Sequence, residues 1–234
     1  MLLFVTATER EMRSAFALQG ALPPLRQGAV ELWCAAGRQA ALLVTGVGLV
    51  NAALALGAAS GLPGLTGVVN LGVAGAFDIQ ALPLGTIALA SREIWPEYGL
   101  ERAEGPGADA RALGFPLWGN RRDADALWDR IELEPDAAAH ALGLRLNPAW
   151  PKADCLSVST VTTTGHRAAA LRRNYRADLE NMEGFALAYG CGRAGLPFLE
   201  LRTVSNRVGS RAAEDWALDR ALEALGKAAA GLLG

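Results

Sequence analysis

The feature that most constrains the fold is a series of short apolar runs, several of them separated by segments with helical spacing. The apolar runs cover residues 2–5, 40–45, 68–71, 86–90, 155–161 and 198–204. Helical spacing occurs at residues 9–18, 50–59, 168–173, 182–194 and 218–233. Buried strands that alternate with helices are typical of a mostly parallel sheet covered on both faces. We therefore predict an α/β fold, a single domain spanning residues 1–234, with a central mixed, mostly parallel twisted β-sheet flanked by helices.

The charge balance and length of the chain limit its partners and its domain count. Lysine and arginine total 22, aspartate and glutamate total 24, and the formal net charge is −2. A chain so close to neutral has no positive field to gather nucleic acid or an anionic membrane surface, so a small-molecule partner is favoured. With 234 residues, 51% of them hydrophobic, the chain can bury the core of one domain without a second.

Cysteine use and the N-terminus predict a cytoplasmic protein. Cys34, Cys155 and Cys191 lie far apart without CxxC spacing, and an odd number of cysteines suits a reducing compartment. This spacing indicates no metal site, and we expect no cofactor. The apolar residues 1–5 lack a preceding basic segment and give way at once to the polar run 6–13, unlike a signal peptide. No run reaches the roughly 20 apolar residues of a membrane-spanning helix.

Polar or small residues follow several predicted strands, at the edge where α/β sheets bind ligands. The first group is the glycine loop Thr45-Gly46-Val47-Gly48, whose small residues let a ligand approach the backbone. The loop differs from a dinucleotide fingerprint because Asn51 occupies the position of the third glycine. Taken alone, it fits a tight turn better than a cofactor site.

Carboxylates stand at two of these edges. Glu9 and Glu11 follow the first predicted strand; such an acid either acts as a general base on water or lies in a solvated first helical turn, where the helix dipole favours it. Glu183 follows Met182 where an apolar helix begins, and its carboxylate either accepts hydrogen bonds from a ribose diol or serves the helix dipole. Spacing alone leaves both alternatives open.

An amide and a run of threonines complete the polar set. Asn206, with Ser205, follows the last predicted strand, and its amide offers one acceptor and two donors to a planar heterocycle. An ordinary turn is the alternative for this pair. Thr163 and Thr164 belong to a run that fits either a ligand loop or β-prone sequence leading to a turn.

Taken in order, these motifs resemble the methylthioadenosine/adenosylhomocysteine nucleosidase branch of the purine nucleoside phosphorylase superfamily, over nearly the whole chain. The motifs that carry the resemblance are Thr45-Gly46-Val47-Gly48 with Asn51, Asn70-Leu71-Gly72-Val73-Ala74-Gly75, Leu84-Gly85-Thr86, Ser157-Val158-Ser159-Thr160, Glu180-Asn181-Met182-Glu183-Gly184 and residues 197–206. The resemblance implies a nucleoside phosphorylase-like fold and a nucleoside substrate. It also implies a homo-oligomer, at least a dimer, often with a neighbour's residue closing the pocket.

The resemblance also implies roles for individual residues. Glu11 matches the carboxylate that activates water, and Glu183 matches the acceptor of the ribose diol, with Met182 packed against the sugar. Asn206 matches the residue that faces the N7 edge of the purine. The loop of Val73, Ala74 and Gly75 matches the one beside the base and ribose, and the backbone around Thr163 and Thr164 matches the segment that flanks the base.

Two departures from the family pattern point to an N-glycosyl hydrolase that releases a 6-oxopurine. Phosphorylases carry a phosphate-holding arginine ahead of the glycine loop, where this chain has Val69-Asn70-Leu71-Gly72. Adenine-cleaving relatives place an aspartic acid where this chain has Asn206, whose amide cannot protonate N7 but suits hypoxanthine. The segment 203–211, followed by Asp215 and Trp216, resembles the futalosine hydrolases, which release hypoxanthine from futalosine in menaquinone biosynthesis.

For such a substrate, Arg207 or Arg211 would pair with the carboxylate, and Trp216 would cover the sugar or its aromatic extension. The alternative is that both arginines are solvated loop charges. Two further functions stay open on the same fold: hydrolysis of methylthioadenosine, adenosylhomocysteine or inosine, and nucleoside binding without activity. Asn206 argues against the first two of these substrates.

Overall fold

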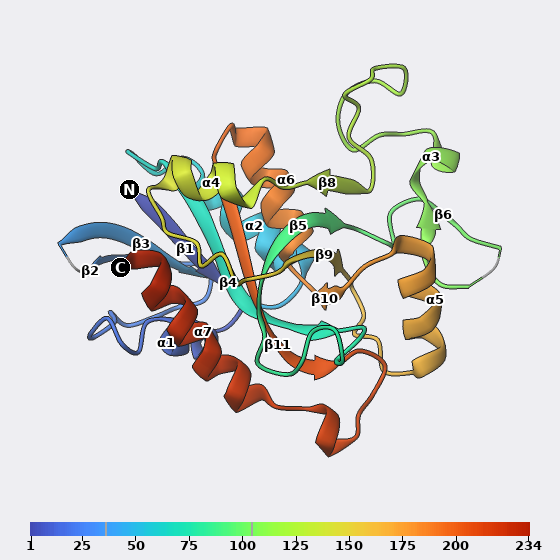
Figure 1. The fold of residues 1–234 in the computed structure, drawn as a ribbon. Helices are drawn as coiled ribbons and strands as arrows, with labels where there is room; N and C mark the ends of the chain where they lie inside the picture. Colours follow the sequence, from blue (N-terminus) through green and yellow to red (C-terminus); the bar gives the residue numbers. More distant parts are fainter. Residues whose placement is uncertain (36, 104) are drawn as a thin grey trace.

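A mixed β-sheet forms the centre of the fold (Figure 1). The computed structural model describes residues 1–35, 37–103 and 105–234. Within them, the nine strands of this sheet are β1 (Leu2–Thr6), β2 (Val30–Ala35), β3 (Arg38–Val44), β4 (Gly67–Ala76), β5 (Ile87–Ile94), β8 (Arg130–Glu132), β9 (Lys152–Ser157), β10 (Leu179–Asn181) and β11 (Phe198–Arg207). Their order is β10-β9-β5-β11-β4-β1-β3-β2, with β8 paired to β5.

Helices cover both faces of the sheet, as the alternating pattern predicted. The helices are α1 (Glu9–Ala15), α2 (Leu49–Ala59), α3 (Ala110–Leu113), α4 (Pro135–Leu142), α5 (Gly165–Tyr175), α6 (Gly184–Ala194) and α7 (Leu218–Leu233), with a 3₁₀ turn at Ala213–Asp215. Phe4 of β1 packs in the core formed with α1, α4 and α7, whereas its neighbours Leu3 and Val5 pack in the core formed with α2 and α6. Burying a side chain of this size stabilises the fold by about 1.5–3 kcal/mol.

The mixed sheet is confirmed, with antiparallel pairs at several places. β1 is parallel to β3 and β4, β4 to β11, and β9 to both β5 and β10. The antiparallel pairs are β2 with β3, β5 with β11 and β8, and β4 with β10. The patterns in the sequence did not indicate β2, β8 or β10, and two of these have only three residues.

Four predicted strand ends were wrong: β5 runs to Ile94, four residues beyond its predicted end, and the ends of three other strands also differ, two of them in ways that change the description of the site. β4 does not stop before Gly72 but continues to Ala76, because β11 pairs with it along its whole length. β11 likewise runs to Arg207, so Asn206 lies within a strand, beside a register shift after Val204, and not in a loop. The third strand, β9, ends at Ser157, four residues earlier than predicted.

Five strands close into a ring around the base of the molecule's main crevice. β10 pairs with β9 on one side and with β4 on the other, and β4, β11, β5 and β9 complete the ring. Gly75 of β4 therefore lies between two neighbours: it pairs with Glu180 of β10 and with Asn206 of β11. This register brings together residues 75, 180 and 206, which are far apart in the sequence.

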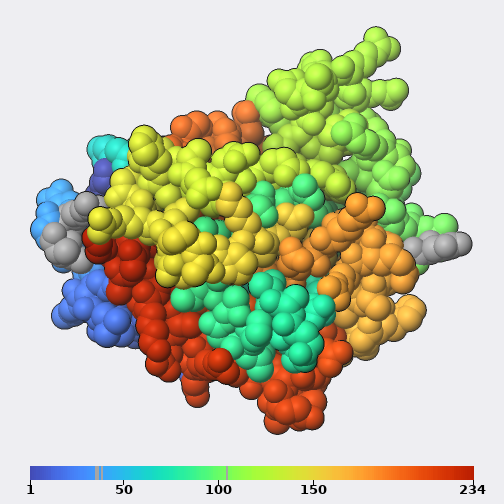
Figure 2. Space-filling model, viewed as in Figure 1, coloured from blue at the N-terminus to red at the C-terminus, as the bar shows by residue number. Residues whose placement is uncertain are grey.

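The segment between β5 and β9 makes the excursion expected for residues 95–151. It forms a small two-stranded sheet of β6 (Leu100–Glu101) and β7 (Ala108–Asp109), and its yellow-green part stands out from the body of the molecule in Figure 2. β8 and α4 then return the chain to the main sheet. In the described parts of the chain, no helix has the length and apolar character needed to cross a membrane.

Candidate active site

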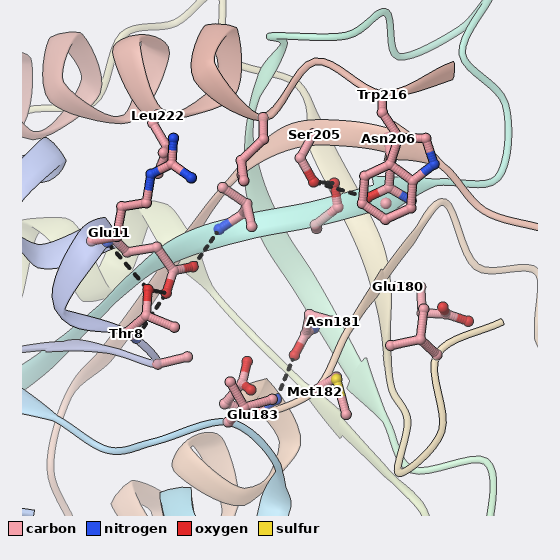
Figure 3. Close-up of a pocket in the computed structure, with 18 residues that line it drawn as sticks. Thr8, Glu11, Glu180, Asn181, Met182, Glu183, Ser205, Asn206, Trp216 and Leu222 are labelled. Carbon is pink, nitrogen blue, oxygen red and sulfur yellow. Dashed lines mark hydrogen bonds between the residues drawn. The ribbon is translucent and has the colours of Figure 1, made fainter. Parts of the chain in front are cut away.

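A pocket of about 400 Å³ opens where β1, β4, β10 and β11 end (Figure 3). Twelve of its lining residues come from the segment after β1, from β4 and β11, and from β10 with the turn into α6: Ala7, Thr8, Arg10, Glu11, Val73, Ala74, Gly75, Glu180, Asn181, Met182, Glu183 and Asn206. The remaining six are Val47, Val161, Ser205, Trp216, Leu218 and Leu222. Most of the residues predicted from the sequence are thus brought together.

Glu11 is held rigidly at the pocket wall. Thr8 caps α1, and its backbone N–H and hydroxyl donate to Oε2 of Glu11 at 2.9 and 2.7 Å. The backbone N–H of Val73 donates to Oε1 at 3.0 Å. The side chain is buried, yet Oε1 keeps an acceptor site beyond the single hydrogen bond that it receives. This carboxylate can therefore hold a further donor, such as water, in a defined position.

Glu183 lies across the pocket from Glu11 (Figure 3), at the N-cap position of α6, where its side chain makes no capping hydrogen bond. Its Oε1 accepts a hydrogen bond of 2.9 Å from the backbone N–H of Gly48, at the end of the glycine loop. Burial raises the pKa of Glu183, the guanidinium of Arg202 opposes that rise, and the charge of Glu11 adds to it. The glycine loop is therefore a tight turn that also positions an acidic side chain.

A buried polar network behind Glu183 was not indicated by the sequence patterns. Arg202, 1% exposed, donates to Glu200 at 2.7 Å and lies 3.9 Å from Glu183. Asn181 accepts hydrogen bonds from the backbone N–H groups of residues 183 and 184, and its amide nitrogen donates to Glu93 at 2.7 Å. The network fixes the turn that carries Met182 and Glu183.

Two glycines, Gly72 and Gly184, let the charged side chains of this network lie close to the backbone. A Cβ on Gly72 would lie 2.5 Å from a nitrogen of Arg202 and 3.0 Å from Oε1 of Glu11. A Cβ on Gly184 would lie 2.5 Å from an oxygen of Glu200. The two distances of 2.5 Å are too short for a real contact, so these glycines make room for the charged groups around the pocket.

Asn206 and Trp216 form the other end of the pocket. The Asn206 carbonyl oxygen accepts from the Ser205 hydroxyl at 2.9 Å, and its amide nitrogen donates to the Arg207 carbonyl at 3.2 Å. Trp216 pairs through its backbone with Asn206, and its indole N–H donates to the carbonyl of Ser210 at 3.0 Å. The segment from 207 to 217 thus folds back and brings an aromatic ring over the pocket (Figure 3).

Glu180 is a pocket residue that the site prediction missed. Its Oε1 accepts from the backbone N–H of Thr162 at 2.9 Å, while its Oε2 is buried and has no partner among the described residues. Burial raises the pKa of Glu180 above its ordinary value. Glu180 is the first residue of the motif that carries the resemblance at residues 180–184, but the prediction assigned a role only to Met182 and Glu183 of that motif.

Four predicted substrate contacts do not line the pocket. Thr163 and Thr164 are exposed, and the side chain of Thr164 caps α5; Val161 lines the pocket in their place. Arg207 is exposed and borders a separate hollow beside α5, because the strand that carries it turns its side chain away. Arg211 stacks its guanidinium 5.0 Å from the ring of Trp216 and so contacts the pocket only through that ring.

The described residues contain no cluster of three or more histidine, cysteine, aspartate or glutamate side chains arranged to hold a metal ion.

Comparison with known proteins agrees with this geometry. The model of the phosphorylase superfamily matches residues 20–233. The futalosine hydrolase of Thermus thermophilus is 36% identical over 196 residues, which cover 82% of this chain and 80% of that protein. The futalosine hydrolase of Streptomyces coelicolor is 37% identical, covering 79% of this chain and 74% of its own. A crystal structure of futalosine hydrolase from Helicobacter pylori shares the fold, with a TM-score of 0.74 and 19% identity over 98% of this chain and 94% of its own. The chain belongs to the phosphorylase superfamily and, within it, to the futalosine hydrolase family.

Proposed function

We propose that this protein hydrolyses the N-glycosidic bond of futalosine and releases hypoxanthine and dehypoxanthine futalosine, a step of menaquinone biosynthesis. The relatives named futalosine hydrolase support the substrate, since they match about four fifths of the chain at 36% and 37% identity. The pocket supports the reaction type. One nucleosidase domain, spanning residues 1–234, carries the activity.

The observation that carries the proposal is the charge of the pocket lining. Among the described lining residues, the buried charged groups are Glu11, Glu180 and Glu183, and the one basic side chain, Arg10, is 61% exposed. The three carboxylates would repel a phosphate anion but not neutral water. The same negative charge stabilises the cationic sugar that forms as the glycosidic bond breaks. The pocket therefore favours hydrolysis over phosphorolysis.

In this reaction Glu11 holds and deprotonates the attacking water. Thr8 and Val73 fix its carboxylate, which leaves one lone pair of Oε1 for the water. Glu183 accepts hydrogen bonds from the ribose hydroxyls, and Met182 packs against the sugar. Val73, Ala74 and Gly75 form the wall beside the base, and Asn206 donates from its amide to N7 or to the oxygen of the leaving hypoxanthine.

The carboxylate of futalosine needs a cationic partner, and Arg10 replaces Arg207 and Arg211 in that role. Arg10 lines the pocket mouth beside Val47, Leu218 and Leu222, which can pack against an aromatic extension. An ion pair of 2.6 Å to the exposed Asp219 holds the guanidinium at the mouth. Trp216 covers the opposite end.

Chromatography of the products formed from futalosine, inosine, methylthioadenosine and adenosylhomocysteine, each with and without phosphate, tests the proposal. We expect hypoxanthine from futalosine at a rate independent of phosphate. Glu11→Gln lowers kcat/KM by roughly 10²- to 10⁴-fold. Glu9→Gln is the matched control, because Glu9 lies on the same helix but is half exposed and pairs with Arg13.

Other results of this assay have clear meanings. Adenine released from methylthioadenosine would contradict the role given to Asn206. Release that requires phosphate would replace hydrolysis by phosphorolysis. No release from any of the four nucleosides would favour a binding protein.

Two wider features belong to the same proposal. Cys34, Cys155 and Cys191 are all free thiols, which suits the reducing cytoplasm. We also propose a homo-oligomer, supported by the exposed apolar residues Val50 and Leu54 on α2 and by Val47 before it.

A further inference from the structure

The carboxylate oxygen Oε2 of Glu180 has no hydrogen-bond partner among the described residues. The residue is 6% exposed, and Oε1 is occupied by the backbone N–H of Thr162 at 2.9 Å. Oε2 is buried without a hydrogen-bond partner among the described residues, although the side chain lines the pocket. A buried carboxylate oxygen is normally hydrogen-bonded. The hydroxyl of Thr162 also acts on this carboxylate, but because Glu180 lines the pocket, its unpaired Oε2 can accept from a donor that enters there.

The strand register sets Glu180 opposite Asn206. Glu180 pairs with Gly75 from one side of β4, and Asn206 pairs with Gly75 from the other. Residues that pair directly across strands point to the same face of a sheet. A Cβ on Gly75 would lie 2.9 Å from the amide nitrogen of Asn206, so glycine keeps the space between them open. In Figure 3 both side chains lie at the Trp216 end of the pocket, away from Glu11.

The edge of a 6-oxopurine matches this pair of side chains. N7 and O6 are acceptors, which the amide nitrogen of Asn206 can serve, and N1 carries a hydrogen that requires an acceptor. Adenine presents a lone pair at N1 instead, which would face the lone pairs of a carboxylate. A carboxylate at this position thus favours hypoxanthine and disfavours adenine by the same contact.

We propose that Glu180 is a specificity residue whose Oε2 accepts the N1–H of the 6-oxopurine, while Asn206 serves the N7 and O6 edge. The inference rests on the proposed function for the identity of the nucleoside, but its chemistry concerns the base alone. Glu180 would be a second residue that recognises the base, on the opposite side of Gly75 from Asn206.

Glu180→Gln provides a sharp test because Thr162 dictates the orientation of the new amide. The Thr162 N–H keeps the carbonyl oxygen, so the NH₂ group must face the pocket and replaces an acceptor by a donor. We expect the inhibition constant of hypoxanthine to rise at least about tenfold and that of adenine to fall. The inhibition constant of 1-methylhypoxanthine, which lacks the N1 hydrogen, rises much less than that of hypoxanthine.

Glu97→Gln is the matched control. Its Oε2 is also buried and unpaired among the described residues, but the side chain does not line the pocket. Glu97 pairs with Arg167 at 3.5 Å, and Arg167 contacts the hydroxyl of Thr162, so this variant detects effects transmitted through the loop. The ratio of the hypoxanthine and adenine inhibition constants stays at the wild-type value in Glu97→Gln.

The outcomes separate this inference from the proposed function. Cleavage of futalosine by the wild type together with an unchanged hypoxanthine-to-adenine ratio in Glu180→Gln would overturn the role of Glu180 alone. Conversely, loss of hypoxanthine preference in a protein that does not cleave futalosine would keep the role of Glu180 and reject the substrate. If Glu180→Gln does not fold, equal wild-type inhibition by hypoxanthine and 1-methylhypoxanthine would overturn the inference.

Discussion

Glu9 and Glu11 stand two residues apart on one helix and end in opposite surroundings. Successive helical residues are rotated by about 100°, so side chains at this spacing point to different sides. Glu9 pairs with Arg13 at the surface, whereas Glu11 turns inward and accepts from Thr8 and Val73. Glu9 therefore lies in a solvated helical turn, whereas Glu11 is buried at the pocket wall.

Arg10 lies between these two acids in the sequence, and its side chain lines the pocket. Arg10→Ala removes the cation at the pocket mouth, and we expect KM for futalosine to rise about tenfold with little change in kcat. Steady-state kinetics measure both constants. The inhibition constant of hypoxanthine, which has no carboxylate, stays at the wild-type value.

Arg207→Ala serves as the control for Arg10→Ala, since Arg207 is exposed and borders a different hollow. Its kinetics should match the wild type. A rise of KM in Arg207→Ala but not in Arg10→Ala would show that Arg207, as predicted from the sequence, and not Arg10 pairs with the carboxylate of the substrate.

At the scale of strands and helices, the strongest predictions came from long patterns and the failures from short or crowded ones. β1, β3 and the amphipathic α7 were placed to within two residues, because an apolar pattern reports burial directly. β10 has three residues, two of them polar, and forms only because strands on both sides pair with it. No local pattern indicates such a strand.

The buried network that joins β5, β9, β10 and β11 carries a prediction about pH. Burial and the charge of Glu200 raise the pKa of Glu93 well above its ordinary value, against hydrogen bonds from Ser157 and Asn181. The folded state therefore binds a proton that the unfolded state has already released, so the free energy of unfolding falls as pH rises through the raised pKa. The contribution of Glu93 to stability is greatest below the ordinary pKa of a glutamate, where both states are protonated.

Glu93→Gln keeps a neutral group at this position and removes the proton uptake. We expect the wild type to lose stability relative to the variant as pH rises above the ordinary range of a glutamate pKa, as measured by urea unfolding across a pH series. A constant difference between the free energies of unfolding of wild type and variant across the pH series would show that Glu93 has the same pKa in the folded and unfolded states.

At the scale of the whole molecule, α2 presents an uncovered apolar surface beside the pocket. Val47, Val50 and Leu54 are 50%, 82% and 73% exposed, and their spacing places them on one side of the chain. Contiguous exposed apolar residues mark interaction sites. Val47 also lines the pocket, so a second copy on this surface would border the mouth of the site.

We expect the protein to sediment as a dimer or larger and Leu54→Glu to weaken association at least about tenfold. Sedimentation velocity across a concentration series measures this change. Leu32→Glu is the comparison, because Leu32 is similarly exposed, at 70%, but belongs to β2 and not to α2. A monomeric wild type, or equal effects of both substitutions, would contradict an interface on α2.

The candidate site also shows what the sequence can and cannot predict about a whole molecule. Glu11, Met182, Glu183, Asn206 and Trp216 were predicted, and all of them line the pocket. Glu180 and Arg10 were missed because their roles depend on the direction in which a side chain points and on how strands align. Ordered motifs carry neither kind of information, and the register that sets Glu180 opposite Asn206 exists only in the folded sheet.

The closed ring of strands has a consequence for slow motions of the molecule. A three-residue strand at a free edge would fray, but β10 is paired with β9 and β4, so its amides exchange with solvent only when the ring itself opens. We therefore expect the amides of Glu180 and Asn181 to exchange more slowly than those of the surface loops. The selectivity of the pocket should therefore survive heating for as long as the fold does, while surface loops open and close around it.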